Sequence, residues 1–214
     1  MTVPDWLQAD RLPRVAVAPG AWRYAVPLFA LGLLLPTAPL LAVVGLAGGV
    51  AVLWFHRDPP RDPPGGGFVS PADGRVSVLR TEGDRVRVGV FLNVTDVHVC
   101  RAPAEGVVEA LEHRAGAHRP AFSKGSERNE RVDVDCGDYE VSLIAGAFAR
   151  RIHPYVESGD RLRRGERVGH VSFGSRADVL LPPEVDREDV RVRKGDRVRA
   201  GETVIAPGPA SKPL

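Results

Sequence analysis

The sequence SGDRLRRGERV at positions 158–168 recurs as KGDRVRAGETV at positions 194–204. In each copy a Gly-Asp pair and a Gly-Glu pair enclose a run of only four residues, and Gly and Asp are residues that tight turns favour. A second repeat relates PADGRVSVL at positions 71–79 to PAEGVVEAL at positions 103–111. The repeats predict a domain of short strands joined by tight turns.

The rest of the chain after Gly67 agrees with this prediction. Apolar and polar residues alternate most clearly in RVRVGV at positions 85–90 and in RVDVD at positions 131–135, as in strands with one buried face. No segment there has the pattern of a long amphipathic helix. We therefore predict a mainly β domain over residues 68–214, a sandwich or open barrel. Its strands are expected at 75–79, 85–92, 107–111, 131–135, 140–144, 168–173 and 178–181.

The turn pattern of the repeats resembles the barrel-sandwich modules of biotinyl and lipoyl carriers, so the expected fold is barrel-sandwich-like. Those carriers need an exposed lysine at a hairpin tip, and the only lysines here are Lys124, Lys194 and Lys212, none in such a hairpin. The repeats thus predict fold rather than carrier function. A noncatalytic, membrane-tethered adaptor module remains the alternative from a different class of protein.

An apolar segment precedes the β domain. Residues 25–55 contain no charge and are longer than the roughly 20 residues of one membrane span, yet too short for two. Pro36 and Pro39 divide the segment, so it is either one long kinked span or a tight hairpin dipping into one leaflet. We predict a cytoplasmic N-terminal segment at 1–23 and a membrane anchor at 24–55.

Arginines flank the apolar segment on both sides, which favours a hairpin with both ends in the cytoplasm. A linker follows at 56–67, HRDPPRDPPGGG, whose four prolines and three glycines exclude a helix. The expected location is therefore the cell membrane, at its cytoplasmic face. The arginines in question are Arg11, Arg14, Arg23, Arg57 and Arg61.

Composition limits the kinds of partner and cofactor to expect. The formal net charge is only +2, so electrostatics gives no reason to expect a nucleic-acid partner. Cys100 and Cys136 form no CxxC pair, which suits a reducing compartment, and no His/Cys spacing predicts a metal site. The scarcity of lysine leaves few candidates for a pyridoxal-phosphate or Schiff-base lysine.

Gly174-Ser175 lies in HVSFGSRADVLLP at positions 170–182, between two β-like runs. If the Ser175 hydroxyl attacks the Gly174 carbonyl, an N-to-O acyl shift gives an ester. Elimination leaves dehydroalanine, which hydrolyses to a pyruvoyl group and ammonia. Glycine suits the position before the serine because it has no Cβ and tolerates a strained backbone. Taken alone, the pair is typical of a plain turn, and only its context favours this chemistry.

Five segments, in this order, resemble the phosphatidylserine decarboxylases, most closely their short form with an N-terminal hydrophobic segment. They are FHRDP at 55–59, VSPADG at 69–74, DVHVCRAP at 96–103, NER at 129–131 and FGSR at 173–176. The resemblance covers roughly residues 25 to 183.

The resemblance implies a self-processing zymogen of phospholipid biosynthesis. It would be cut into a β chain, 1–174, and an α chain, 175–214, with the pyruvoyl group as covalent cofactor. That group would form a Schiff base with phosphatidylserine and release CO2 and phosphatidylethanolamine. Another serine-headed lipid, such as archaetidylserine, is an alternative substrate. The sequence leaves the acyl or ether tails and the formation of a homo-oligomer open.

The resemblance also assigns roles to residues near the cleavage site Gly174-Ser175. Asp73 matches the acidic residue of the self-cleavage relay, and as a residue before a glycine it also suits a plain turn. His98 would donate the proton that quenches the carbanion. Alternation would place Asp96, His98 and Cys100 on one strand face.

Arg101 departs from the pattern of the longer family members, which have a second histidine at that position. Arginine stays protonated and cannot act as the base, so either His98 performs both tasks or another group helps, with His170 and His153 as candidates. Arg101 could instead bind the lipid phosphate or the leaving carboxylate, and Lys124 could meet a phosphate. NER at 129–131 is either a structural turn or part of the substrate shell.

For the histidine, we predict that His98→Ala abolishes decarboxylation, whatever its effect on self-cleavage, because the quenching proton would be lost. Release of CO2 from a serine-headed lipid measures this. Normal turnover by the variant would remove His98 from the site.

Overall fold

The computed structural model describes residues 16–34, 38–119, 121, 128–147, 151–172 and 174–208. The chain divides into two compact units, Met1–Pro60 and Arg61–Leu214. The first unit holds the apolar segment, and the second holds the β domain.

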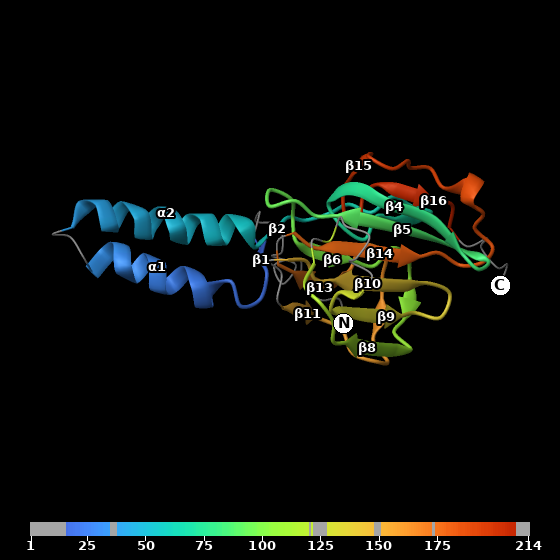
Figure 1. Cartoon of the computed structure of the whole chain (residues 1–214), viewed down its shortest axis with the longest axis horizontal. Coiled ribbons are helices and arrows are strands. Elements are labelled where there is room, and N and C mark those ends of the chain that lie inside the picture. Colours follow the sequence, from blue (N-terminus) through green and yellow to red (C-terminus); the bar gives the residue numbers. More distant parts are fainter. Residues whose placement is uncertain are drawn as a thin grey trace, which may run out of the picture. The chain divides into compact units, whose positions relative to one another are not determined.

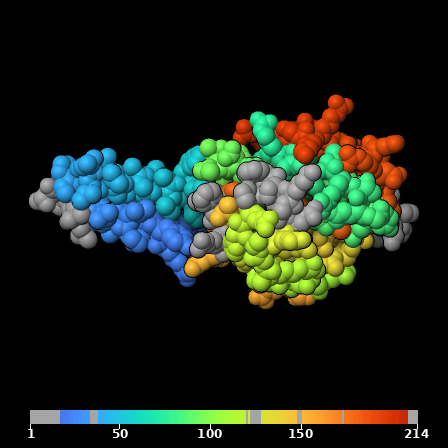
Figure 2. Space-filling view, in the orientation of Figure 1, coloured from blue at the N-terminus to red at the C-terminus, as the bar shows by residue number. Residues whose placement is uncertain are grey.

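Two helices dominate the first unit, α1 (Trp22–Leu34) and α2 (Pro39–Phe55), and they lie side by side (Figures 1 and 2). Glycines allow this close packing: a Cβ on Gly45 would lie 2.7 Å from the carbonyl oxygen of Leu28 in α1. The strands β1 (Ala16–Val17) and β2 (Arg57–Asp58) pair at the base of the helices. The apolar segment therefore folds as a hairpin and not as one long kinked helix.

The hairpin leaves large apolar side chains uncovered, with Leu33 71% and Leu40 76% exposed. Neither helix in the described part of the chain is both long and apolar enough to cross a membrane.

The second unit is built on an open seven-stranded antiparallel sheet in the order β15-β4-β5-β14-β10-β9-β8 (Figure 1). Its central strand is β14, which pairs over five residues with β5 on one side and with β10 on the other. The strands are β4 (Gly74–Glu82), β5 (Arg85–Phe91), β8 (Ala110–Arg114), β9 (Arg131–Asp135), β10 (Glu140–Ile144), β14 (Arg176–Leu180) and β15 (Arg197–Val198).

Smaller sheets complete the unit. A three-stranded sheet has the order β11-β13-β6, and two further pairs are β12-β7 and β16-β3. These strands are β3 (Phe68–Val69), β6 (Val99–Arg101), β7 (Gly106–Val107), β11 (Ile152–Pro154), β12 (Arg161–Leu162), β13 (Arg167–Val171) and β16 (Val204–Ala206). The helical element in the described part of this unit is one short 3-10 turn, η3 (Arg187–Asp189).

The prediction of a mainly β domain is confirmed, but the described strands form open sheets and no closed barrel. The two copies of the first repeat fold alike, each with a two-residue strand between turns whose glycines have positive φ. The expected strands at 131–135 and 140–144 are confirmed residue for residue. The run 107–111 is divided between β7 and β8.

Two details differ from the sequence analysis near the cleavage site. Strand β14 begins at Arg176 and not at 178, so it starts directly after Ser175. Strand β6 begins at Val99, and the carboxylate of Asp96 instead accepts a hydrogen bond from the Asn93 amide in a turn. Asp96 therefore does not share a strand face with His98, because it lies in the turn before β6, where the alternation of strand side chains does not apply.

The seven-stranded sheet has one apolar and one charged face. Alternation places the core residues Ala177 and Val179 of β14 on the first face. We call the opposite side the charged face, and its members include Arg87, Asp133, Glu140, Ser142, Arg176 and Asp178. Ser175 precedes Arg176, so alternation directs its side chain toward the core.

We predict that Leu143→Ala lowers the free energy of unfolding by about 3 kcal/mol, because the Leu143 side chain is fully buried in the core. Urea unfolding in a Ser175→Ala background, which we expect to remain one chain, measures it. Val107→Ala is the control, since Val107 is 45% exposed and its truncation should change stability by less than about 0.5 kcal/mol. Equal losses in both variants would contradict this description of the core.

Candidate active site

The Gly174-Ser175 bond lies at the entrance to the central strand. On one side, the amide of Leu92 donates a 3.0 Å hydrogen bond to the carbonyl oxygen of Ser175. On the other side, Ile144 pairs with Arg176, and the same register places Gly146 opposite Gly174. The Gly174-Ser175 bond therefore lies between the extended ends of β5 and β10.

Gly174 has φ +76°, in the left-handed region that costs a residue with a Cβ roughly 1–2 kcal/mol. A Cβ built on Gly174 would meet no atom within 4 Å. Glycine is thus required here by backbone conformation and not by lack of space. The backbone at the predicted cleavage site is held in a conformation that few other residues adopt.

Ser175 is fully buried, and its Oγ has no hydrogen-bond partner among the described residues. A buried hydroxyl without a partner costs about 1–3 kcal/mol, so such atoms are uncommon outside functional sites. The chain therefore places a buried hydroxyl, with no partner among the described residues, next to the carbonyl that it is predicted to attack. It does not contain a preformed hydrogen bond from Ser175 to a base within the described part of the chain.

His98 lies immediately before β6 and is 2% exposed. Its backbone carbonyl accepts a 3.3 Å hydrogen bond from the amide of Val171, four residues before Ser175. The histidine is thus buried beside the segment that leads to the Gly174-Ser175 bond. Its role as proton donor stays a prediction.

Asp73 precedes β4, two strands away from Ser175 in the sheet, which corresponds to about 10 Å between backbones. Its carboxylate accepts hydrogen bonds from Arg61 at 2.9 and 3.0 Å and from the amide of Ala200 at 2.8 Å. These contacts fix the carboxylate, and they do not join it to Ser175. The relay role of Asp73 also stays a prediction.

Arg101 lies near Asp73. Its Nη1 donates a 2.9 Å hydrogen bond to the carbonyl of Gly165, and its Cδ would lie 3.2 Å from a Cβ on Gly201, next to Ala200. Burial raises the pKa of the Cys100 thiol between them to about 12, with a further increase from Asp73 and an opposing effect from Arg101. Cys100 is therefore a neutral core residue.

The other histidine candidates contact each other and Tyr155, and the lysine candidate is not among the described residues. His170 accepts or donates a 2.8 Å hydrogen bond with the hydroxyl of Tyr155, and its ring stacks on His153 at 4.6 Å. His170 pairs with Val99 in the sheet, one residue after His98, so the two histidine side chains point to opposite faces. Lys124 lies outside the described residues. The described residues contain no group of three or more potential metal ligands.

A family profile described as phosphatidylserine decarboxylase matches residues 50–206, which is most of the chain and includes the Gly174-Ser175 bond. The chain belongs to the phosphatidylserine decarboxylase family. The prediction of a decarboxylase, a carboxy-lyase, is therefore confirmed, and the noncatalytic adaptor is not favoured.

Individual relatives agree with the family assignment. A Halobacterium salinarum protein provisionally named archaetidylserine decarboxylase proenzyme is 58% identical over 194 residues, covering 90% of this chain and 99% of the relative. The phosphatidylserine decarboxylase proenzyme of Thermobifida fusca is 47% identical over 206 residues, covering 90% and 92%. Both names describe proenzymes.

Within this decarboxylase, the residue after the serine forms a buried ion pair that the sequence analysis missed. Arg176 donates to both carboxylate oxygens of Asp178, at 2.7 and 3.0 Å, and to the carbonyl of Ala121 at 3.3 Å. The carboxylate fits over Gly89, where a Cβ would lie 2.5 Å from its Oδ1. Burial raises the pKa of the Asp178 carboxyl, and Arg176 and Arg87 oppose this increase.

Other residues of the site gave weaker signals in the sequence. Arg61 belongs to the second of two adjacent RDPP segments, so nothing in the sequence distinguished it from Arg57 as the partner of Asp73. Asn129 is buried and bonded to backbone atoms of Arg119 and Ala145, which favours the structural interpretation of the NER segment. Gly146 follows a predicted strand, and the sequence gave no sign that it lies against Gly174; only the strand pairing in the structure shows this.

For the ion pair, we predict that Asp178→Ala in the Ser175→Ala background lowers the free energy of unfolding by about 3–5 kcal/mol, because Arg176 would be left charged and buried. Urea unfolding measures the loss. Replacing both partners, Arg176→Met with Asp178→Leu, should recover most of it.

The control is Glu112→Ala, which removes an exposed ion pair with Arg114 on the same sheet and should leave the unfolding midpoint nearly unchanged. An Asp178→Ala protein as stable as the Glu112→Ala protein would show that the buried pair does not stabilise the strand.

Proposed function

We propose that the protein is a self-processing, pyruvoyl-dependent decarboxylase of a serine-headed phospholipid, converting phosphatidylserine to phosphatidylethanolamine and CO2. The observation that carries the proposal is the Gly174-Ser175 bond itself. Its glycine has a left-handed backbone, and its serine hydroxyl is buried without a partner among the described residues. Both features suit a bond that is to be broken by its own serine.

Self-cleavage needs only atoms of this chain and one water. The Oγ of Ser175 bonds to the carbonyl carbon of Gly174, the C–N bond breaks, and the hydroxyl proton goes to the freed amine. The resulting ester is then eliminated: the Cα proton of residue 175 is removed, its Cβ–O bond breaks, and the Gly174 carboxyl group leaves with that proton, which leaves dehydroalanine at position 175. Water then converts it to a pyruvoyl group, and ammonia leaves.

The residues around position 175 fit a pyruvoyl group. The carbonyl oxygen of residue 175 survives the cleavage, so its hydrogen bond from the Leu92 amide would hold the new N-terminus in place. The group would supply an electron sink for the electrons released with CO2. His98, buried beside the segment before Ser175, would return a proton to the substrate carbon.

Both chains would stay together after the cut. The α chain, 175–214, contributes β14, which lies between β5 and β10 of the β chain, 1–174. Ten residue pairings hold it there, five on each side. Removing that strand would open the core, so the two products would form one enzyme.

The substrate's tails are a separate question. The relative with 58% identity carries an archaetidylserine name, and the one with 47% carries a phosphatidylserine name. Archaetidylserine is therefore a second candidate substrate, with the same serine head group on ether-linked tails.

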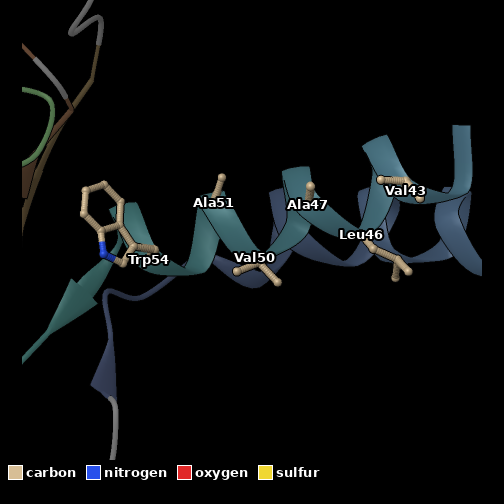
Figure 3. A pocket seen from close by; sticks show the side chains of 6 residues that line it. All are labelled: Val43, Leu46, Ala47, Val50, Ala51 and Trp54. Atoms are coloured by element: carbon tan, nitrogen blue, oxygen red, sulfur yellow. The ribbon is translucent and has the colours of Figure 1, made fainter. Parts of the chain in front are cut away.

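The α1–α2 hairpin supports a membrane location at the cytoplasmic face. One side of α2 carries an apolar hollow lined by Val43, Leu46, Ala47, Val50, Ala51 and Trp54, all from this helix (Figure 3). The 17 residues of α2 span about 26 Å, less than the roughly 30 Å of a hydrocarbon core. We propose that the hairpin dips into one leaflet, with both ends at the same surface.

Intact mass of the purified protein tests the function. We expect two fragments divided between residues 174 and 175, the smaller with a carbonyl-reactive N-terminus and no free amine, whereas Ser175→Ala should remain one chain. Wild-type protein that remains one full-length chain would contradict the proposal.

The cut enzyme, mixed with vesicles of phosphatidylserine or of archaetidylserine, should release CO2 from at least one of them, and the ratio of the two kcat/KM values identifies the preferred tails. Cut protein that releases CO2 from neither lipid would contradict the proposed substrate class.

A further inference from the structure

The carbonyl of the scissile bond lies against a glycine of the neighbouring strand end. Gly146 stands opposite Gly174, two residues beyond β10. A Cβ built on Gly146 would lie 1.7 Å from the carbonyl oxygen of Gly174 and 2.7 Å from its carbonyl carbon. Real Cβ atoms do not approach other atoms this closely, so the scissile carbonyl occupies the space that any side chain at position 146 would need.

The backbone that presents Gly146 is itself fixed. Both polar backbone atoms of Ala145 are held by two consecutive residues: its amide donates to the Glu130 carbonyl at 2.9 Å, and its carbonyl accepts from Nδ2 of Asn129 at 2.8 Å. Gly146 therefore cannot move away without breaking this pair of hydrogen bonds.

Asn129 is 3% exposed, and both polar atoms of its side-chain amide form hydrogen bonds. Its Oδ1 accepts from the Arg119 amide at 2.9 Å, and its Nδ2 donates to the Arg119 carbonyl at 2.7 Å as well as to Ala145. One acceptor and two donors match an amide and no other side chain of this size.

We propose that Gly146, fixed by Asn129, is a positioning residue for self-cleavage. Because Gly146 has no side chain, the Gly174 carbonyl oxygen can pack against its Cα. This packing directs the oxygen toward the end of β10. The peptide plane is thereby set for attack by Ser175 Oγ on the carbonyl carbon. In that attack the Oγ–C bond forms, the C–N bond breaks, and the hydroxyl proton passes to the nitrogen of residue 175. The inference rests on the proposed self-processing function.

Gly146→Ala tests the proposal, with conversion of precursor to two chains followed by intact mass. We expect conversion to slow by at least tenfold or to stop. The chains that are cut should keep normal decarboxylase kcat per pyruvoyl group, counted with a carbonyl-reactive reagent, because Gly146 positions only the bond that is broken. A general structural defect would lower this ratio as well.

Gly67→Ala is the matched control. A Cβ there would lie 2.7 Å from Cγ1 of Val204 and 2.8 Å from the carbonyl oxygen of Ala206, just before β3, which belongs to a different sheet from β14. This variant should be cut at the wild-type rate even if its melting temperature falls. Folded Gly146→Ala protein that is cut at the wild-type rate would overturn the proposal.

Asn129→Asp provides an independent test if Gly146→Ala does not fold. The substitution keeps the size of the side chain but turns a carboxylate oxygen toward the carbonyls of Arg119 and Ala145, so the hold on Ala145 is lost. We expect slower cleavage with unchanged kcat per pyruvoyl group, and wild-type cleavage would overturn the proposal. If the wild-type chain itself is never cut, the proposed function fails, and Gly146 is not the cause.

Discussion

The pairing of β14 between β5 and β10 is the interaction on which the rest of the structure depends. It places one short strand at the centre of a seven-stranded sheet and fixes the register of the residues just before it. Because Ser175 continues that register, its carbonyl meets the Leu92 amide, and Gly174 meets Gly146. A slip by one residue would turn Ser175 to the charged face.

The same pairing explains how the proposed cut, just before the central strand of the sheet, would leave the protein folded. The bond that would break lies at the end of a strand and not within it, so none of the ten cross-strand pairings of β14 is lost. The buried Arg176–Asp178 pair adds a polar constraint on the other face. The buried Ser175 hydroxyl, which has no hydrogen-bond partner among the described residues, is a destabilising feature that the surrounding sheet tolerates.

The sequence predicted those parts of the fold that depend on local alternation. RVDVD at 131–135 and EVSLI at 140–144 have a period of two, and both are strands within these bounds. The start of β14 was predicted two residues late, because the charged Arg176 gave no sign of belonging to a buried strand. Arg176 and Asp178 pair with each other, and the space for the Asp178 carboxylate is provided by Gly89 of the neighbouring strand β5. Sheet order and the small sheets depend on pairings between distant residues, which one sequence does not contain.

Sequence motifs identified the candidate cleavage site. They did not identify the hydrogen-bond partners of the site residues, because those partners lie far away in the sequence. Gly174-Ser175 was identified from its context, and the family assignment agrees with it. The partners of Asp73 were not identified, because Arg61 and Ala200 are joined to it only by the fold. Gly146 has no functional group. Its proposed role depends on the Gly174 carbonyl oxygen that packs against it, and the sequence does not show this contact.

A crystal structure of the uncut Ser175→Ala precursor tests the central claim most directly. The account predicts an intact bond between residues 174 and 175, a positive φ at Gly174 and a Gly174 carbonyl directed at the Cα of Gly146. A precursor in which Gly174 has a negative φ and its carbonyl points away from Gly146 would contradict it.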